Sequence, residues 1–281
     1  MLKSKLHSLA LVVLLVAVLP AIAMGGSVAP AAMGTPPVEN LDTGEFFAGI
    51  QDAIDDTDTL DGHTLEMKVA SHTTITTQIA FDKSLTLQAG ASGDTLTPGS
   101  DTGSSGDARG WFLIDSGKSV TFSGLTLDGT GSLVYNAIRN HGTLTVENCV
   151  FTEIKYNESG PNYAGVGVTT VAASGALTVT DCSFSEIGRI GLQIFGDATV
   201  SGCTYTGKGP GNWLDYFICL DSQGASIGDA VVDGCTVSGN RGIAVSDGTW
   251  SGGMLISTAL GLGTEAEVTN VLAYMKHQSG Q

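Results

Sequence analysis

A short phrase that recurs along the chain is the strongest constraint on how the chain can fold. The stretch LTVENCVFTEI begins at Leu144 and LTVTDCSFSEI begins at Leu177, with seven of eleven letters identical. Weaker copies occur before and after these two, at steps of 21 to 36 residues. A fixed phrase separated by loops of variable length is typical of a solenoid, in which each repeat contacts only its neighbours. Aligned on the position of the cysteine, the copies have these residues there: Gly90, Leu125, Cys149, Cys182, Cys203, Cys235 and Val271.

Each copy of the phrase is consistent with two short β-strands that flank a bend. Side chains alternate along a strand, so Leu144 and Val146 of the first strand and Cys149 and Phe151 of the second are expected to face one interior. The residue before the aligned position is Gly, Asn or Asp in six of the seven copies. These residue types tolerate a positive φ, which predicts a sharp bend there. Third strands are expected in the variable parts, at Ala137–Asn140, Gly165–Val171, Ile190–Phe195, Tyr216–Asp221, Gly242–Val245 and Met254–Ser257.

This pattern resembles the right-handed parallel β-helix of the pectate-lyase-like superfamily, whose asparagine-ladder turn matches the bend residue. The resemblance covers about residues 40–276. It implies an all-β, single-stranded solenoid with three strands per coil and about six or seven coils. It also implies an N-terminal helix that closes the first coil. Asp42 and Glu45 fit a capping box, so this helix is expected over Asp42–Asp56, with an apolar face that includes Phe46 and Phe47.

The first residues of the chain have the features of a secretory signal peptide. Lys3 and Lys5 precede the apolar run Leu9–Leu19, and the letters AIA at 21–23 fit a cleavage site. The alternative is an uncleaved membrane anchor, for which this run is short. We therefore expect a secreted, periplasmic or cell-surface protein with no membrane span in its mature form. The expected parts are a signal peptide (1–23), a disordered linker (24–41), the β-helix domain (42–276) and a tail (277–281).

The charge and the cysteines exclude several function classes. The formal net charge is −16, and loss of Lys3 and Lys5 with the signal peptide would make it −18. So acidic a protein is expected to be repelled by nucleic acid and by anionic lipid. The sequence has no CxxC pair, and no His accompanies the aligned cysteines, so a metal site is not expected there. Because stacked side chains point in parallel, we expect buried free thiols rather than disulfides, and Cys219 is expected in the same core.

The variable segments contain the candidate binding residues. In the superfamily that the chain resembles, the substrate groove follows one strand face and is walled by the loops that lead into that strand. Five cations fall one per coil in these segments, with aromatic residues beside them, including Tyr135. Aromatic faces stack on sugar rings, and spaced cations can bind carboxylates or sulfates. The alternative is that these cations only balance neighbouring glutamates. The expected binding residues are Arg139, Lys155, Tyr156, Tyr163, Arg189, Lys208, Trp213, Asp215, Tyr216 and Arg241.

An enzyme is the second hypothesis. Lyases of this resemblance use calcium held by clustered acids, with an Arg or Lys as base, and Asp215, Asp221 and Glu186 could approach Arg189. The sequence shows no tight carboxylate cluster, and the hydrolase signatures NTD, GHG and RIK are absent. His141 is interpreted as a turn residue, because no acid is aligned with it. The Gly/Ser-rich segment DTGSSGD, 101–107, is interpreted as a flexible loop, although it could hold calcium, the one cofactor considered.

The outward strand positions and the end of the final coil give two further predictions. Rows of outward hydroxyl residues are expected, of a kind also found on ice-binding solenoids, although Thr is common on any exposed strand. The last residues offer no cap for the final coil, whose open edge could serve for self-association. The function expected from the sequence is non-catalytic binding of polysaccharide or another surface, and the alternative is a lyase or hydrolase of acidic polysaccharide. The two expected rows of outward hydroxyl residues are Thr121, Thr145, Thr178 and Thr199, and Thr126, Ser183, Thr204 and Thr236.

Overall fold

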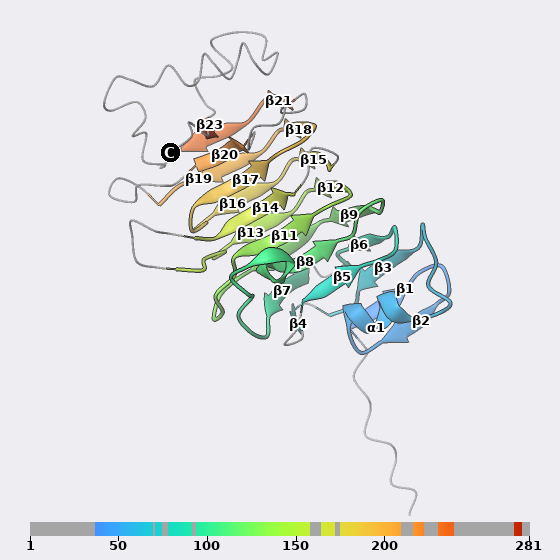
Figure 1. Cartoon of the computed structure of the whole chain (residues 1–281). Coiled ribbons are helices and arrows are strands. Elements are labelled where there is room, and N and C mark those ends of the chain that lie inside the picture. The colour runs from blue at the N-terminus through green and yellow to red at the C-terminus, as the bar shows by residue number, and fades with distance from the viewer. Residues whose placement is uncertain are drawn as a thin grey trace, which may run out of the picture. The chain divides into compact units, whose positions relative to one another are not determined.

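The chain forms three sheets of stacked strands (Figure 1). The computed structural model describes residues 37–69, 71–74, 78–91, 94–157, 164–171, 175–208, 216–221, 230–238 and 273–276. Sheet A contains, in spatial order, β2 (Glu45–Phe47), β1 (Val38–Asn40), β3 (Thr64–Met67), β6 (Thr86–Gln88), β9 (Ser119–Ser123), β12 (Thr143–Glu147), β15 (Ala176–Thr180), β18 (Ala198–Ser201) and β21 (Ala230–Asp233).

The other two sheets have seven strands each. Sheet B contains β4 (Ser71–Thr74), β7 (Asp94–Pro98), β10 (Leu125–Asp128), β13 (Val150–Thr152), β16 (Ser183–Ser185), β19 (Thr204–Thr206) and β22 (Thr236–Ser238). Sheet C contains β5 (Ile79–Phe81), β8 (Gly110–Ile114), β11 (Asn136–Asn140), β14 (Val166–Thr170), β17 (Ile190–Ile194), β20 (Tyr216–Asp221) and β23 (Ala273–Lys276). Two short helices, α1 (Ile50–Asp55) and η1 (Gly106–Arg109), complete the described elements.

Each coil takes one strand from each sheet in the order A, B, C, and the described residues make seven such coils. The first coil is β3–β4–β5 and the seventh is β21–β22–β23. Neighbouring coils pair in parallel throughout, for example β12 with β15 and β13 with β16. Among the described strands the antiparallel pairs are β1 with β2 and β1 with β3. The expected right-handed parallel β-helix is therefore confirmed, with its third strands at β11, β14, β17 and β20.

The interior is filled by columns of apolar side chains in register. Leu144 and Val146 of sheet A and Phe151 of sheet B are fully buried, as the alternating pattern predicts. The rings of Phe151 and Phe184 lie in adjacent coils and stack with their centroids 4.8 Å apart and an interplanar angle of 9°. Room for the aromatic side chains comes from Gly191, where a Cβ would lie 3.1 Å from the ring of Phe217. Ring stacks and facing glycines together give a continuous core along the coils.

The bend between sheets A and B has the predicted left-handed backbone. The residues before the aligned position have φ near +60° in five successive coils. Three are glycines, and the other two are Asn148 at 54° and Asp181 at 53°. Glu153 and Glu186, at the next bend, have φ values of 55° and 52°, which the sequence did not indicate. The members of the first set are Gly124, Asn148, Asp181, Gly202 and Gly234.

We expect Asn148→Ala to lower the free energy of unfolding by about 1 kcal/mol, because a Cβ without a local polar group disfavours this left-handed conformation. Asn148→Gly is the matched control and should change it by less than about 0.5 kcal/mol, since Gly124 occupies the equivalent position in the preceding coil. Urea unfolding of the three proteins measures both differences. Equal stability of the Ala and Gly variants would contradict a role for the bend residue's backbone.

The N-terminal cap differs from the prediction. The helix begins at Ile50 with Gly49 as its N-cap, whereas the predicted helix began at Asp42. Glu45–Phe47 instead forms β2, and the carboxylate of Asp42 accepts a hydrogen bond from the backbone N–H of Thr64 at 2.7 Å. Ile50, Ala53 and Ile54 form the buried face of the helix, but Phe46, expected on that face, is 47% exposed. Val38–Asn40, inside the predicted linker, forms β1.

Helix α1 covers the first strand of sheet C through one side chain. The Gln51 side-chain oxygen accepts a hydrogen bond from the Ala80 N–H at 2.8 Å, and its Nε2 donates to the Ala80 carbonyl at 3.3 Å. Lys83 holds the end of the same helix by donating to the carbonyls of Ile54 and Asp56 at 2.6 and 2.7 Å. The amide of Gln51 thus makes the two hydrogen bonds that a further strand would make with Ala80.

Two predicted alignments are wrong. In the second coil Asp94, not Gly90, pairs with Leu125 in the aligned column, because the chain needs four more residues to pass the bend. At the other end, Ala273–Lys276 forms β23 of sheet C. The alignment of Val271 with the cysteines had instead predicted that Ala273, two residues later, belongs to a sheet B strand. Gly242–Val245, Met254–Ser257, the predicted signal peptide (1–23) and the predicted tail (277–281) lie outside the described residues. Neither described helix has the length and hydrophobicity needed to cross a bilayer.

Candidate functional site

The predicted cations lie on or beside sheet C where they are described. Arg139 lies in β11 on the outward side of the sheet, and Arg189 directly precedes β17. Lys155 and Lys208 lie beyond the ends of β13 and β19, where the chain passes from sheet B to sheet C. Tyr216 is described only as part of the backbone of β20. Outside the described residues lie Tyr163, Trp213, Asp215 and Arg241.

The two lysines have hydrogen-bond partners within the protein. The Lys155 ammonium lies 2.8 Å from a carboxylate oxygen of Glu153 and 2.9 Å from one of Glu186, and so links two coils. Burial lowers the pKa of Lys155, but the hydrogen bonds to the two glutamates outweigh it and raise that pKa above its ordinary value. Lys208 donates to the carbonyls of Ile187 and Gly188. These contacts favour the alternative that the loop cations balance neighbouring charge and bind backbone.

A cluster of Asp107, Arg139 and His141 lies on the outward side of sheet C. One carboxylate oxygen of Asp107 is 2.9 Å from Arg139 Nε and 2.8 Å from His141 Nε2. The Arg139 guanidinium, and after it the His141 ring, holds the pKa of Asp107 below its ordinary value. Sequence reasoning missed this cluster because Asp107 lies 34 residues before His141, and only the coil register brings them together.

The segment that contains Asp107 is ordered, which corrects its interpretation as a flexible loop. Gly106–Arg109 forms η1, and the Gly103 N–H donates to the carbonyl of Ala108 at 2.7 Å. The carboxylate of Asp101 accepts a hydrogen bond from the N–H of Leu133 at 2.7 Å. The segment is therefore fixed to the next coil and can hold Asp107 in one place. The sequence signal was present in the two aspartates, which anchor turns and cap backbone groups.

A cation and two aromatic rings form a ladder beside the cluster. The guanidinium carbon of Arg109 lies 4.5 Å from the centre of the Tyr135 ring. The ring of Tyr135 lies 5.0 Å from that of Tyr156, at an interplanar angle of 53°. All three side chains are partly exposed, and they belong to three successive coils. We call Arg109, Tyr135 and Tyr156 the aromatic ladder.

Two buried polar atoms near the ladder lack a hydrogen-bond partner among the described residues. They are the side-chain oxygen of Asn136, a residue 1% exposed, and Nε of Arg189. The amide nitrogen of Asn136 does have partners, the hydroxyl of Thr169 at 2.9 Å and the carbonyl of Tyr135 at 3.1 Å.

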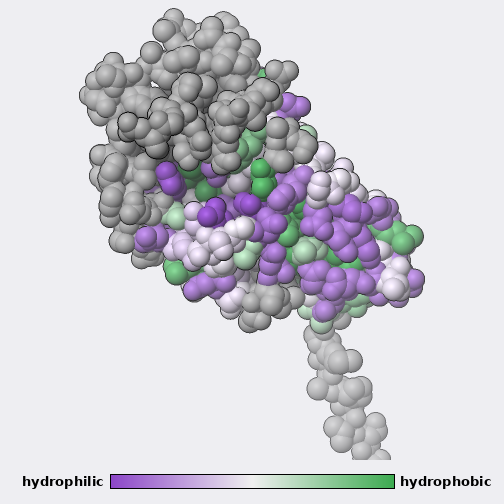
Figure 2. Space-filling model, viewed as in Figure 1, coloured by the Kyte–Doolittle hydropathy of each residue, from purple (hydrophilic) through white to green (hydrophobic). Residues whose placement is uncertain are grey.

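In the view of Figure 2, hydrophobic residues appear only as small separate spots on the described surface. A ligand on this surface would therefore be bound through polar groups and rings.

The cysteine column is buried in the core, and a hydrogen bond with Cys182 lowers the pKa of its first member, Cys149. Cys149, Cys182, Cys203 and Cys235 are buried free thiols in adjacent coils. Hydrogen bonding from the preceding thiol raises the pKa of Cys182 and of Cys203 to about 12. Neutral thiols are poor nucleophiles and poor ligands at neutral pH. Cys219 is also buried, but on the outward side of sheet C in a separate small cluster with Val166 and Ile190, which corrects its expected place in the main core.

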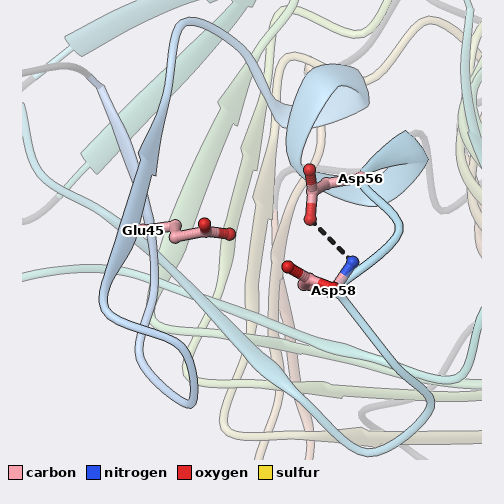
Figure 3. Close-up of side chains that lie close together, drawn as sticks. All are labelled: Glu45, Asp56 and Asp58. Atoms are coloured by element: carbon pink, nitrogen blue, oxygen red, sulfur yellow. Dashed lines mark hydrogen bonds between the residues drawn. The ribbon is translucent and has the colours of Figure 1, made fainter.

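Three carboxylates near the N-terminal cap are the one group among the described residues whose geometry would suit a shared metal ion. Glu45, Asp56 and Asp58 have carboxylate oxygens within 4.8 Å of one another. Figure 3 shows Glu45 pointing from β2 toward the turn after α1, where the N–H of Asp58 donates to Asp56 at 2.9 Å. Glu45 and Asp58 are exposed, and in a chain with 28 acidic residues such groups also arise without a metal.

The geometry can therefore offer sugar-stacking rings and an oriented histidine on one sheet. Asp107 lies in η1 with Arg109, and Arg139 lies in β11, which Tyr135 directly precedes and His141 directly follows. Comparison of the chain with protein families, with curated proteins and with solved structures gave no significant match.

Proposed function

We propose that the protein binds polysaccharide without cleaving it, along the outer face of sheet C. The observation that supports this most is the aromatic ladder of Arg109, Tyr135 and Tyr156, with ring centres 5.0 Å apart. Partly exposed rings offer apolar faces to the C–H groups of sugar rings, and their hydroxyls offer polar contacts at the edge. A ladder that follows the coils suits an extended ligand better than a small one.

The charge of this face favours a neutral glycan. Arg139 and Lys155 are paired with carboxylates, which offsets the charge of these two cations. The whole chain is strongly acidic, which opposes binding of an acidic polymer at low salt. The proposal also includes export to the cell surface or beyond, which rests on the apolar run Leu9–Leu19, and membership of the pectate-lyase-like superfamily, which rests on the repeat and its bend.

Affinity electrophoresis in gels that contain neutral or acidic polysaccharides tests this proposal. Tyr135→Ala should weaken binding of the retained glycan by about two- to tenfold, the effect of losing one stacked ring. Phe46→Ala is the matched control, because Phe46 is an exposed ring on β2, away from sheet C. Unchanged mobility of the wild-type protein in every gel, or equal effects of the two variants, would refute the ladder as a binding site.

A second candidate is cleavage of polysaccharide, which the Asp107–His141 pair favours. In the tautomer that donates Nε2–H to Asp107, the other ring nitrogen can accept a proton from a substrate. The Nε atom of Arg139 lies 2.9 Å from the same carboxylate of Asp107, and its guanidinium could stabilise negative charge on a sugar acid. Incubation with a polyuronate and calcium, followed at the absorbance of unsaturated products, tests this. Turnover that His141→Ala abolishes would support cleavage, and turnover that persists would exclude this pair.

A further inference from the structure

The outer face of sheet B carries two straight columns of hydroxyl residues, which we call the hydroxyl face. They flank the buried middle residue of each strand, such as Leu127, Phe151 or Phe184. Serine or threonine occupies six of the seven positions in each column. By backbone register the first column is Ser71, Thr95, Thr126, Val150, Ser183, Thr204 and Thr236, and the second is Thr73, Thr97, Asp128, Thr152, Ser185, Thr206 and Ser238, of which Ser71, Thr73 and Ser238 are described as backbone alone.

The hydroxyl face is almost free of charge in a chain that is rich in acids. Asp128 is the one ionisable residue in the two columns, and its carboxylate accepts hydrogen bonds from the N–H and hydroxyl of Thr130 at 2.9 and 2.6 Å. The columns contain no aromatic residue and no cation. Twenty-eight acidic residues are thus distributed over the chain while this face stays nearly neutral. Its composition therefore differs from that of an ordinary solvated acidic surface.

The two columns are periodic in two dimensions. Figure 1 shows the strands of sheet B lying one beside the next, and their parallel register is unbroken from β4 to β22. Hydroxyls therefore repeat at about 4.8 Å from coil to coil and at about 6.6 Å along each strand. The hydroxyls of Ser185 and Thr152 approach within 3.3 Å across adjacent coils. Among the described side chains Thr204, Thr206 and Thr236 are exposed, so solvent reaches the face.

The threonine row on sheet A is also confirmed and provides a comparison. Thr64, Thr86, Thr121, Thr145, Thr178 and Thr199 occupy one outward column in successive coils. The next outward column on that sheet contains Glu66, Glu147 and Asp233. Sheet A thus has a single hydroxyl column beside charged residues, whereas sheet B has two such columns side by side with Asp128 as their one ionisable residue.

We propose that the hydroxyl face of sheet B binds the surface of ice. A hydroxyl both donates and accepts hydrogen bonds, as each water molecule of a crystal lattice does. Threonine methyl groups between the hydroxyls restrict the positions that water can take, so a regular array orders water in two dimensions. Charged groups would hold water in orientations set by their own field, and their near absence leaves the periodic hydroxyls to set the pattern. This function is independent of glycan binding on sheet C.

A crystalline polysaccharide is the other periodic partner, and the composition of the face disfavours it. Sugar surfaces are bound largely by ring stacking, and the two columns offer no ring. The face has no cation for an acidic polymer either. What remains is a neutral array of small groups, which matches an uncharged lattice of water.

Partition into growing ice tests the proposal with the full mature chain. The wild-type protein should concentrate in the ice fraction and change the shape of single crystals. The double variant Ser183→Lys/Thr204→Lys places two charges on the hydroxyl face and should lower the ice-bound fraction about tenfold. The matched control is Thr178→Lys/Thr199→Lys, which places the same charges in the same two coils on sheet A. It should leave ice binding unchanged, and far-ultraviolet circular dichroism checks that all proteins are folded.

Three results would overturn the proposal. The wild-type protein could be excluded from ice to the same degree as an ordinary globular protein. The sheet A variant could lose ice binding while the sheet B variant keeps it. The wild-type protein could bind microcrystalline cellulose or chitin and not ice. Val150→Thr gives an independent check, because it completes the first column at an exposed position and should increase the ice-bound fraction.

Discussion

Phe184→Ala is expected to lower the free energy of unfolding by about 3–5 kcal/mol, the usual range for truncating a buried aromatic ring. Phe184 is 1% exposed and stacks on Phe151 with ring centres 4.8 Å apart. On its other side it contacts Phe217 with ring centres 5.7 Å apart. Its removal leaves a cavity between coils whose backbones are fixed by parallel hydrogen bonds, so collapse can fill little of the space.

Chemical denaturation measures this effect, with Val150→Ala as the control. Val150 is 37% exposed and precedes the ring partner Phe151 in β13, so its truncation should change the free energy of unfolding by less than about 0.5 kcal/mol. Because each coil contacts only its neighbours, hydrogen exchange should be followed as well, to show whether β13, β16 and β19 lose protection first. A loss below about 1 kcal/mol would contradict a packed interior at this coil.

Asp94→Asn is expected to raise the free energy of unfolding at neutral pH by about 1–3 kcal/mol, the size of a desolvation penalty for a buried polar group. Asp94 is 2% exposed, and one of its carboxylate oxygens has no hydrogen-bond partner among the described residues. The other oxygen accepts a hydrogen bond from the Gly90 N–H at 2.6 Å. Asparagine can keep that bond through its carbonyl oxygen and carries no charge to desolvate.

The same substitution has a defined pH dependence. Burial raises the pKa of Asp94 above its ordinary value. The folded protein therefore disfavours the ionised carboxylate, and the penalty is complete above the folded-state pKa. It fades as the pH falls through that pKa and is absent below the unfolded-state pKa. The gain from Asp94→Asn should shrink accordingly in thermal melts between neutral and acidic pH.

Asp82→Asn is the control for this experiment, because Asp82 is exposed. It should change the free energy of unfolding by less than about 0.5 kcal/mol across the same pH range. A gain from Asp94→Asn that persists undiminished at the lowest pH would mean that the charge of Asp94 is not the cause.

The repeat predicted the inward columns well, and the reason is the period of a strand. Once Cys149 and Cys182 are placed in one column, alternation places Phe151 and Phe184 in the next, and the structure has both pairs in register. The alignment was wrong where the phrase weakens. Asp94 replaces an apolar residue in the second coil, and no local signal distinguishes it from an acid in a loop. The positive φ of Glu153 and Glu186 was missed because glutamate is not a usual residue at such bends.

The candidate site was predicted only in part, because its contacts join residues about one coil apart in sequence. Arg139 was among the predicted binding residues, but its partner Asp107 lies 32 residues earlier. The length of the loops between strands sets which residues of successive coils meet, and periodicity contains no information about that length. Tyr135 and Tyr156 were noted as neighbours of cations, whereas their contact with each other follows from the register of β11 with β14.

The side-chain amide of Gln51 gives the coil stack a defined starting point. It occupies the two hydrogen-bonding groups of Ala80 that an additional parallel strand would need. On sheet A the antiparallel β1 occupies the corresponding edge of β3, so a further coil could not join there with the direction of the others. Growth of this architecture by duplication of an internal coil would leave that terminus intact. Longer or shorter versions of the protein could therefore be built by inserting or removing central coils, with the same N-terminal closure kept in all of them.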